Sequence, residues 1–122
     1  MKQITEDYVS YEIAQLLKEK GFDIPCRQAY FNGSLVDYTL YGFCDGELLN
    51  CPSQSLAIKW LREVHNIYID ILTYTTGKNI QFRWVGYDNG RLFSQEKGKI
   101  IYFESYEKAV EAAILYVLKN LI

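Results

Sequence analysis

Two runs of alternating residues in the second half of the chain indicate neighbouring β-strands. Between residues 67 and 74, three isoleucines alternate with a second set that contains tyrosine, leucine and aspartate, which is the two-residue period of a strand. A second run of similar type extends from Ile80 to Tyr87, and Gly77 lies in the turn between the two. The pattern predicts an antiparallel pair with isoleucines on one face and tyrosines on the other.

A first helix is predicted over residues 5–20, because apolar residues recur there at the helical spacing. Thr5 is the expected N-cap, and Ile4 and Val9 occupy the two positions of a hydrophobic staple. We expect Gly21 to end the helix in a left-handed conformation, with the following phenylalanine folded back onto the last turn.

A second helix is predicted after Pro52, with Ser53 as its N-cap and Asn66 as a left-handed stop. Its expected apolar face includes Trp60 and Val64. A last helix, rich in alanine and valine, is predicted after a second serine cap at position 105.

Shorter signals predict the remaining strands. Asn32-Gly33, a strong hairpin signal, stands between two β-type segments within residues 27–44, and Asp45-Gly46 offers a second turn. Residues 88–98 read as a polar loop, and residues 99–103 read as the third strand of the larger sheet.

Together these elements predict an α+β fold. It comprises an antiparallel sheet of about three strands plus an N-terminal hairpin, packed with three helices in the order α-ββ-α-β-β-β-α. The length of 122 residues predicts a single domain over residues 1–122. Hydrophobic residues make up 49% of the chain, which excludes wholesale disorder.

The charge balance argues against electrostatic binding of nucleic acid. Thirteen Lys and Arg residues against fifteen Asp and Glu residues leave a net charge of -2, which gives no long-range attraction to polyphosphate. The first apolar stretch is interrupted by Glu12 and Gln15, so it lacks the continuous core of a secretory signal or a membrane span. We expect a cytoplasmic protein with no membrane partner.

The three cysteines and the single histidine do not form a recognisable metal motif. Cys26, Cys44, Cys51 and His65 are separated by gaps of 18, 7 and 14 residues, so no two ligands share the tight turn of a zinc knuckle. No local signature supports a Cys-His nucleophile either. We expect reduced thiols, no metal and no cofactor.

The carboxylates give no catalytic signal. Glu107 and Glu111 are four residues apart on the last predicted helix, where a solvated face is the expected environment. Glycine-rich phosphate loops, metalloprotease motifs and nucleophile elbows are all missing from the sequence. The sequence therefore predicts no catalytic residues and no enzymatic activity.

The tyrosine-rich face of the predicted sheet is the candidate binding site. Its expected members are Tyr68, Tyr74, Arg83, Tyr87 and Tyr102. Such rings beside a guanidinium can stack on bases or anchor a protein partner. Alternatively, the N-terminal 52 residues cover this face. We favour this second interpretation. An uncovered tyrosine and leucine face would exceed the apolar patch of roughly a few hundred Å² that soluble monomers usually tolerate.

Three segments taken together resemble known proteins. They are residues 16–26, residues 52–63 and residues 106–113, in this order along most of the chain. They resemble small uncharacterised proteins encoded by phages and mobile elements of gut Bacteroides. The resemblance implies a small intracellular accessory protein and carries over no functional residues.

From Ser53 onward, the predicted order α-β-β-β-α is similar to that of the double-stranded-RNA-binding domain, and the alanine-rich segment 109–113 is similar to its last helix. The resemblance implies lysines that bind phosphate at the start of that helix. In this chain Glu104 and Glu107 accompany Lys108 there.

Two functions follow as hypotheses. The first is a non-enzymatic interaction module that binds a protein partner, or a second copy of itself, through the sheet edge or the aromatic face. The alternative is a nucleic-acid-binding module that uses Arg83 and the basic residues of segment 78–99.

Overall fold

The computed structural model describes residues 3–37 and 48–122, in which helices and antiparallel sheets form the predicted α+β fold. In chain order the elements are α1 (Tyr11–Glu19), β1 (Gln28–Phe31), β2 (Ser34–Asp37), β3 (Leu49–Asn50), α3 (Gln54–His65), β4 (Ile67–Thr76), β5 (Asn79–Asp88), β6 (Arg91–Phe93) and α4 (Tyr106–Asn120). The predicted turn at Asp45-Gly46 lies outside the described residues.

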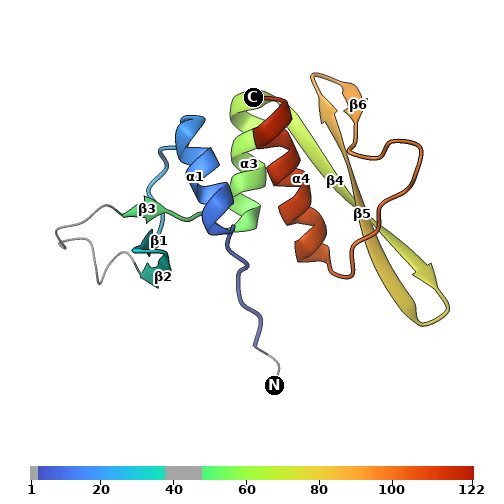
Figure 1. Ribbon diagram of the computed structural model, residues 1–122, viewed down its shortest axis with the longest axis horizontal. Helices are drawn as coiled ribbons and strands as arrows, with labels where there is room; N and C mark the ends of the chain where they lie inside the picture. The colour runs from blue at the N-terminus through green and yellow to red at the C-terminus, as the bar shows by residue number, and fades with distance from the viewer. Residues whose placement is uncertain (1–2, 38–47) are drawn as a thin grey trace.

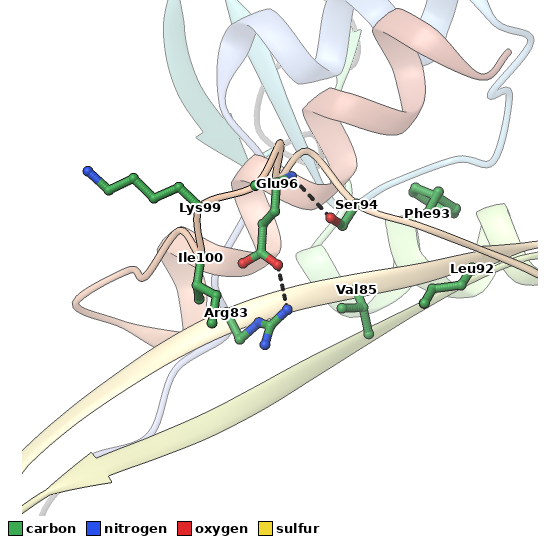
Figure 2. Close-up of a pocket in the computed structure, with 9 residues that line it drawn as sticks. Arg83, Val85, Leu92, Phe93, Ser94, Glu96, Lys99 and Ile100 are labelled. Carbon is green, nitrogen blue, oxygen red and sulfur yellow. Dashed lines mark hydrogen bonds and ion pairs between the residues drawn. The ribbon is translucent and has the colours of Figure 1, made fainter.

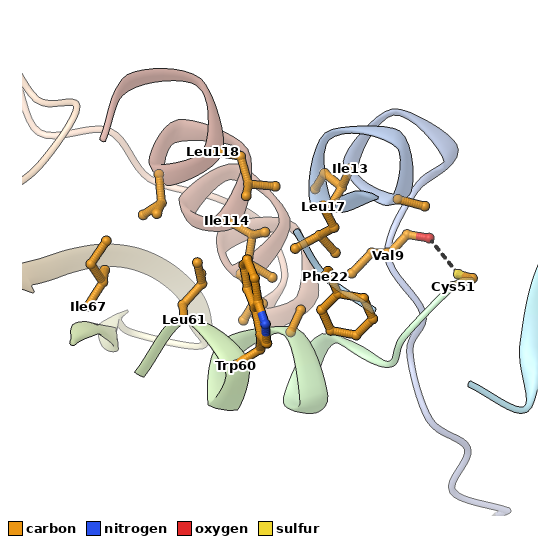
Figure 3. Packing of buried hydrophobic residues seen from close by; sticks show 14 residues of the cluster. Val9, Ile13, Leu17, Phe22, Cys51, Trp60, Leu61, Ile67, Ile114 and Leu118 are labelled. Atoms are coloured by element: carbon orange, nitrogen blue, oxygen red, sulfur yellow. Dashed lines mark hydrogen bonds between the residues drawn. The ribbon is translucent and has the colours of Figure 1, made fainter. Parts of the chain in front are cut away.

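The helices lie between two small sheets (Figure 1). One sheet has the strand order β2-β1-β3 and lies beside α1, whereas the other has the order β4-β5-β6 and packs against α3 and α4. The hydrophobic core lies where the three helices meet. Figure 3 shows Ile13 and Leu17 of α1 directed toward Ile114 of α4, with Leu61 of α3 in the same cluster, and all four side chains are buried.

Helix α1 begins later than predicted, with Ser10 rather than Thr5 as its N-cap. The preceding residues are extended, because their backbone bonds to the segment that leads into α3. The Val9 N–H donates to the Pro52 carbonyl at 3.1 Å, and the Asp7 carbonyl accepts a hydrogen bond from the Gln54 N–H at 2.8 Å. The predicted staple is therefore wrong, and Ile4 is 91% exposed.

The end of α1 is as predicted. Gly21 adopts a φ of 96°, and the Phe22 N–H donates to the Leu17 carbonyl at 2.9 Å. These contacts fold the Phe22 ring back into the core, where it packs edge-on against Trp60.

The caps of α3 and α4 are confirmed. Ser53 accepts a hydrogen bond from the backbone of the first turn of α3, Asn66 ends that helix with a φ of 56°, and Ser105 caps α4. Val64, predicted on the apolar face of α3, is instead 60% exposed, because the buried face of α3 ends at Leu61.

The Asn32-Gly33 hairpin is also confirmed. Both residues have positive φ angles, 50° and 82°, and the turn joins β1 to β2 with Phe31 opposite Ser34. A third short strand, β3, was not predicted. It pairs with β1 and places Leu49 opposite Tyr30.

In the larger sheet, the third strand is not the predicted one. Asn89 and Gly90 have φ angles of 51° and 86° and turn the chain directly into β6, so this segment is a hairpin rather than a loop. Because β6 occupies the last residues of β5 on that side, residues 99–103 reach β5 only at a single bridge between Phe103 and Phe82. The Asn-Gly signal that identified the first hairpin was present here too.

The β5–β6 pair depends on a close contact between a glycine and a ring. Gly86 is directly opposite Phe93, whose ring covers the glycine and packs against Trp84 and Tyr116. A side chain at position 86 would occupy the space that this ring fills.

We predict that Gly86→Ala destabilises the protein by about 1–3 kcal/mol, because the added methyl group overlaps the Phe93 ring. Denaturant unfolding followed by circular dichroism measures the change. In a Phe93→Ala background the same substitution should cost much less. An equal loss in both backgrounds would show that the ring is not the obstacle.

Candidate functional site

The strand register brings the predicted binding residues onto one side of the larger sheet. Tyr68 is directly opposite Tyr87, Leu72 is opposite Arg83, and directly opposed residues share a face. Tyr102 joins them, since its ring lies 5.3 Å from that of Tyr74. We call this surface the outer face: Tyr68, Asp70, Leu72, Tyr74, Gln81, Arg83, Val85, Tyr87, Leu92 and Tyr102.

Residues 3–37 and 48–52, the described part of the N-terminal segment, do not cover the outer face, so that prediction is wrong. Tyr68, Leu72 and Tyr74 are 46%, 42% and 49% exposed, respectively. The N-terminal helix instead packs on α4, on the opposite side of the helices from the sheet (Figure 1). The apolar stripe of α1 meets equally apolar stripes there, and this leaves the outer face of the sheet open.

An ion pair holds Arg83 at the margin of this face. Its guanidinium pairs with Glu96, whose side chain is only 12% exposed. A second Glu96 oxygen accepts from the Ile101 N–H at 2.9 Å, and the Ser94 hydroxyl accepts from the Glu96 N–H at 3.0 Å. Figure 2 shows the carboxylate directed from the loop toward Arg83. These bonds anchor the loop 94–101 beside β5 and neutralise the guanidinium.

An open groove of about 620 Å³ lies between this loop and β5. Val85, Leu92 and Ile100 line its apolar part, and the Arg83–Glu96 pair lies among its polar lining (Figure 2). The groove therefore combines an aliphatic wall with a compensated charge.

Sequence reasoning missed several contributors to this site, among them Leu92 and Glu96. Leu92 was missed because β6 was taken for part of a loop, although the Asn89-Gly90 turn signals its hairpin. Glu96 was missed because no local pattern links a loop carboxylate to an arginine thirteen positions earlier.

The thiols and the imidazole lie apart. Cys51 lies before α3, where its thiol donates to the Val9 carbonyl at 3.3 Å, whereas His65 lies at the end of α3 against the Trp60 ring. Burial raises the pKa of Cys51 to about 12 and also raises the pKa of Cys26. Within residues 3–37 and 48–122 no group of three potential metal ligands converges. Cys44 lies outside the described residues.

Glu107 is exposed as expected, but Glu111 is not on a solvated face. One carboxylate oxygen of Glu111 accepts from the Ser10 N–H at 2.8 Å, and the other accepts from the Gln54 amide at 3.1 Å. The carboxylate thereby links the first turns of α1 and α3 to α4. This role explains why Glu111 is half-buried.

Comparison with known proteins adds no relative: no family model, no curated protein and no solved structure matches the chain. None of the helices in the described part of the chain combines the length and the apolar character needed to cross a bilayer. The outer face and its edge are therefore the basis for assigning a function.

We predict that Cys51 resists alkylation in the folded protein at pH 8. A pKa raised from 9.0 to about 12 lowers its thiolate fraction about a thousandfold. Iodoacetamide treatment followed by peptide mass spectrometry should leave Cys51 unmodified until denaturant is added. Rapid labelling of native Cys51 would contradict this assignment.

Proposed function

We propose that this chain is a non-enzymatic, cytoplasmic interaction module that binds a protein partner through the outer face. One observation carries the proposal: aromatic and aliphatic side chains lie exposed together across all three strands of one sheet. Contiguous apolar surface of this kind marks interaction sites in soluble proteins. The resemblance to phage and mobile-element proteins supports an accessory role.

The chemistry of the outer face supports a protein as the ligand. Tyrosine offers a large ring with little conformational entropy to lose, and both tyrosine and arginine are enriched at binding hot spots. Arg83 is already oriented by Glu96, so the margin of the face is ordered before any partner arrives.

The contacts of the Cys51 thiol and the Glu111 carboxylate support structural rather than catalytic roles for both groups. The Cys51 thiol is held by a backbone carbonyl, and Glu111 is held by two donors from other helices. These contacts tie each group to the packing of the core rather than to a solvent-accessible cleft.

Replacing Tyr87 and Leu92 together by serine should weaken partner binding, because both side chains lie on the outer face and away from the core. Tagged protein would capture partners from a lysate of the host, with quantitative mass spectrometry as the readout. We expect at least about a tenfold loss.

The matched control is Val64→Ser, which removes from α3 an apolar side chain about as exposed as that of Leu92. It should capture the same partner as the wild type. Capture that survives the double substitution, while circular dichroism shows a folded protein, would refute the outer face as the binding surface.

A nucleic-acid-binding module is the alternative. The observed order α3-β4-β5-β6-α4 supports it, since it is the α-β-β-β-α order of the double-stranded-RNA-binding domain. The ion pairs weigh against it: Arg83 is neutralised by Glu96, and Lys108, at the start of α4, by Glu104.

A mobility-shift assay separates the two functions. The protein-binding proposal predicts no shift of single-stranded or double-stranded probes at about 50 mM salt, where non-specific electrostatic binders still bind. A shift that disappears steeply as salt is added would favour the alternative.

A further inference from the structure

Strand β4 has one free edge. It pairs with β5 on one side, and no other strand within residues 3–37 and 48–122 pairs with its second side. From Leu72 to Thr76 every residue is exposed. This half of the edge is therefore accessible to a second strand, whereas Ile67 at the start of β4 is buried.

The hydrogen bonds of β5 identify which residues of β4 point outward. Phe82 donates to and accepts from Phe103, at 2.9 and 2.6 Å, so its backbone groups point away from β4. The direction of the backbone N–H and C=O groups alternates along a strand, so the odd-numbered residues of β5 point toward β4. The register places these residues opposite the even-numbered residues of β4, which therefore bond to β5. The outward-facing residues are Ile67, Ile69, Ile71, Thr73 and Thr75.

This edge lacks the features that usually prevent strand addition. All ten residues of β4 pair with β5 without a bulge, and the strand contains no proline and a single charged residue, Asp70. A long, regular and nearly uncharged edge is a template for another strand.

We propose that the edge of β4 pairs with β4 of a second copy of this chain, antiparallel about a two-fold axis at Ile71. This axis places every outward-facing residue opposite another outward-facing residue, for example Ile69 opposite Thr73 of the second copy. An axis at Leu72 would leave Ile67 unpaired. The axis at Ile71 therefore satisfies the most backbone groups.

The charges are compatible with a second copy. At this register Asp70 lies opposite Leu72 of the second copy, so the two aspartates are not opposed. Tyr68 lies opposite Tyr74 of the second copy, which gives two aromatic pairs at the junction. The net charge of only -2 adds little repulsion between the copies.

This inference goes beyond the proposed function: the edge of the sheet binds a second copy of the chain, whereas the outer face binds a different protein. A C2 contact of this type is closed, because each copy uses its one free β4 edge. The two three-stranded sheets become one sheet of six strands, with both outer faces on the same side.

Light scattering after size exclusion tests the pairing. At micromolar concentration the wild type should have twice the chain mass of 14.3 kDa. Thr73→Pro removes an outward N–H that β5 does not use, and should give a monomer with an unchanged circular dichroism spectrum. Thr73→Ala keeps that N–H and should remain a dimer.

A second pair of variants tests the register. Leu72→Asp places a carboxylate opposite Asp70 of the second copy at two symmetric positions, and should raise the dissociation constant about tenfold. Leu72→Lys also removes the leucine but places a positive charge opposite Asp70, so the dimer should persist.

A monomeric wild type, or a dimer that survives Thr73→Pro, would overturn the pairing. Equal behaviour of Leu72→Asp and Leu72→Lys would overturn the axis at Ile71. Tyr87 and Leu92 lie on β5 and β6 and not on the edge strand β4. A monomer whose partner capture still depends on them would therefore refute the dimer and leave the proposed function standing. A dimer that depends on the β4 edge, but whose partner capture is unchanged by substitution of Tyr87 and Leu92, would support the dimer and refute the proposed function.

Discussion

The whole arrangement depends on the burial of α4 on more than one side. From Ala109 to Leu118 no residue of this helix is exposed. Such a helix cannot lie on a surface, and it must contact apolar partners around most of its circumference. The sheet strands β4 and β5 meet it on one side, and α1 and α3 meet it on another. This requirement places the helices in the middle layer and the two small sheets outside them.

The open outer face is a consequence of that layer order. Helix α1 carries a narrow apolar stripe that includes Ile13 and Leu17, and the core between α3 and α4 offers enough apolar surface to satisfy it. Because α1 packs against this core, the described part of the chain has no further helix to cover the second face of the β4-β5-β6 sheet. Tyrosine suits this position, because its ring can pack against neighbours while its hydroxyl stays hydrated.

Local signals in the sequence predicted local structure well. The caps at Ser53 and Ser105 and the Asn32-Gly33 turn act within a few residues, so the pattern contains the whole interaction. The failures involve distant segments. Thr5 is a competent cap, but the backbone around Val9 bonds to Pro52, and that pairing is invisible in a helical period. The faces of the sheet were assigned correctly, whereas the choice of which face is covered depended on how three helices share one core.

The outer face and the free edge of β4 are properties of the same strands, and this links the two proposals. A two-stranded ribbon is marginal in isolation, and β6 has only three residues, so the far half of the β4–β5 hairpin is joined on the β5 side only by the Phe82–Phe103 bridge. Pairing at the edge would supply that support, because it places a strand on the unsupported side of Thr73 and Thr75. It would also double the width of the tyrosine-bearing surface. A partner that spans both copies would then bind with an affinity greater than either face provides alone.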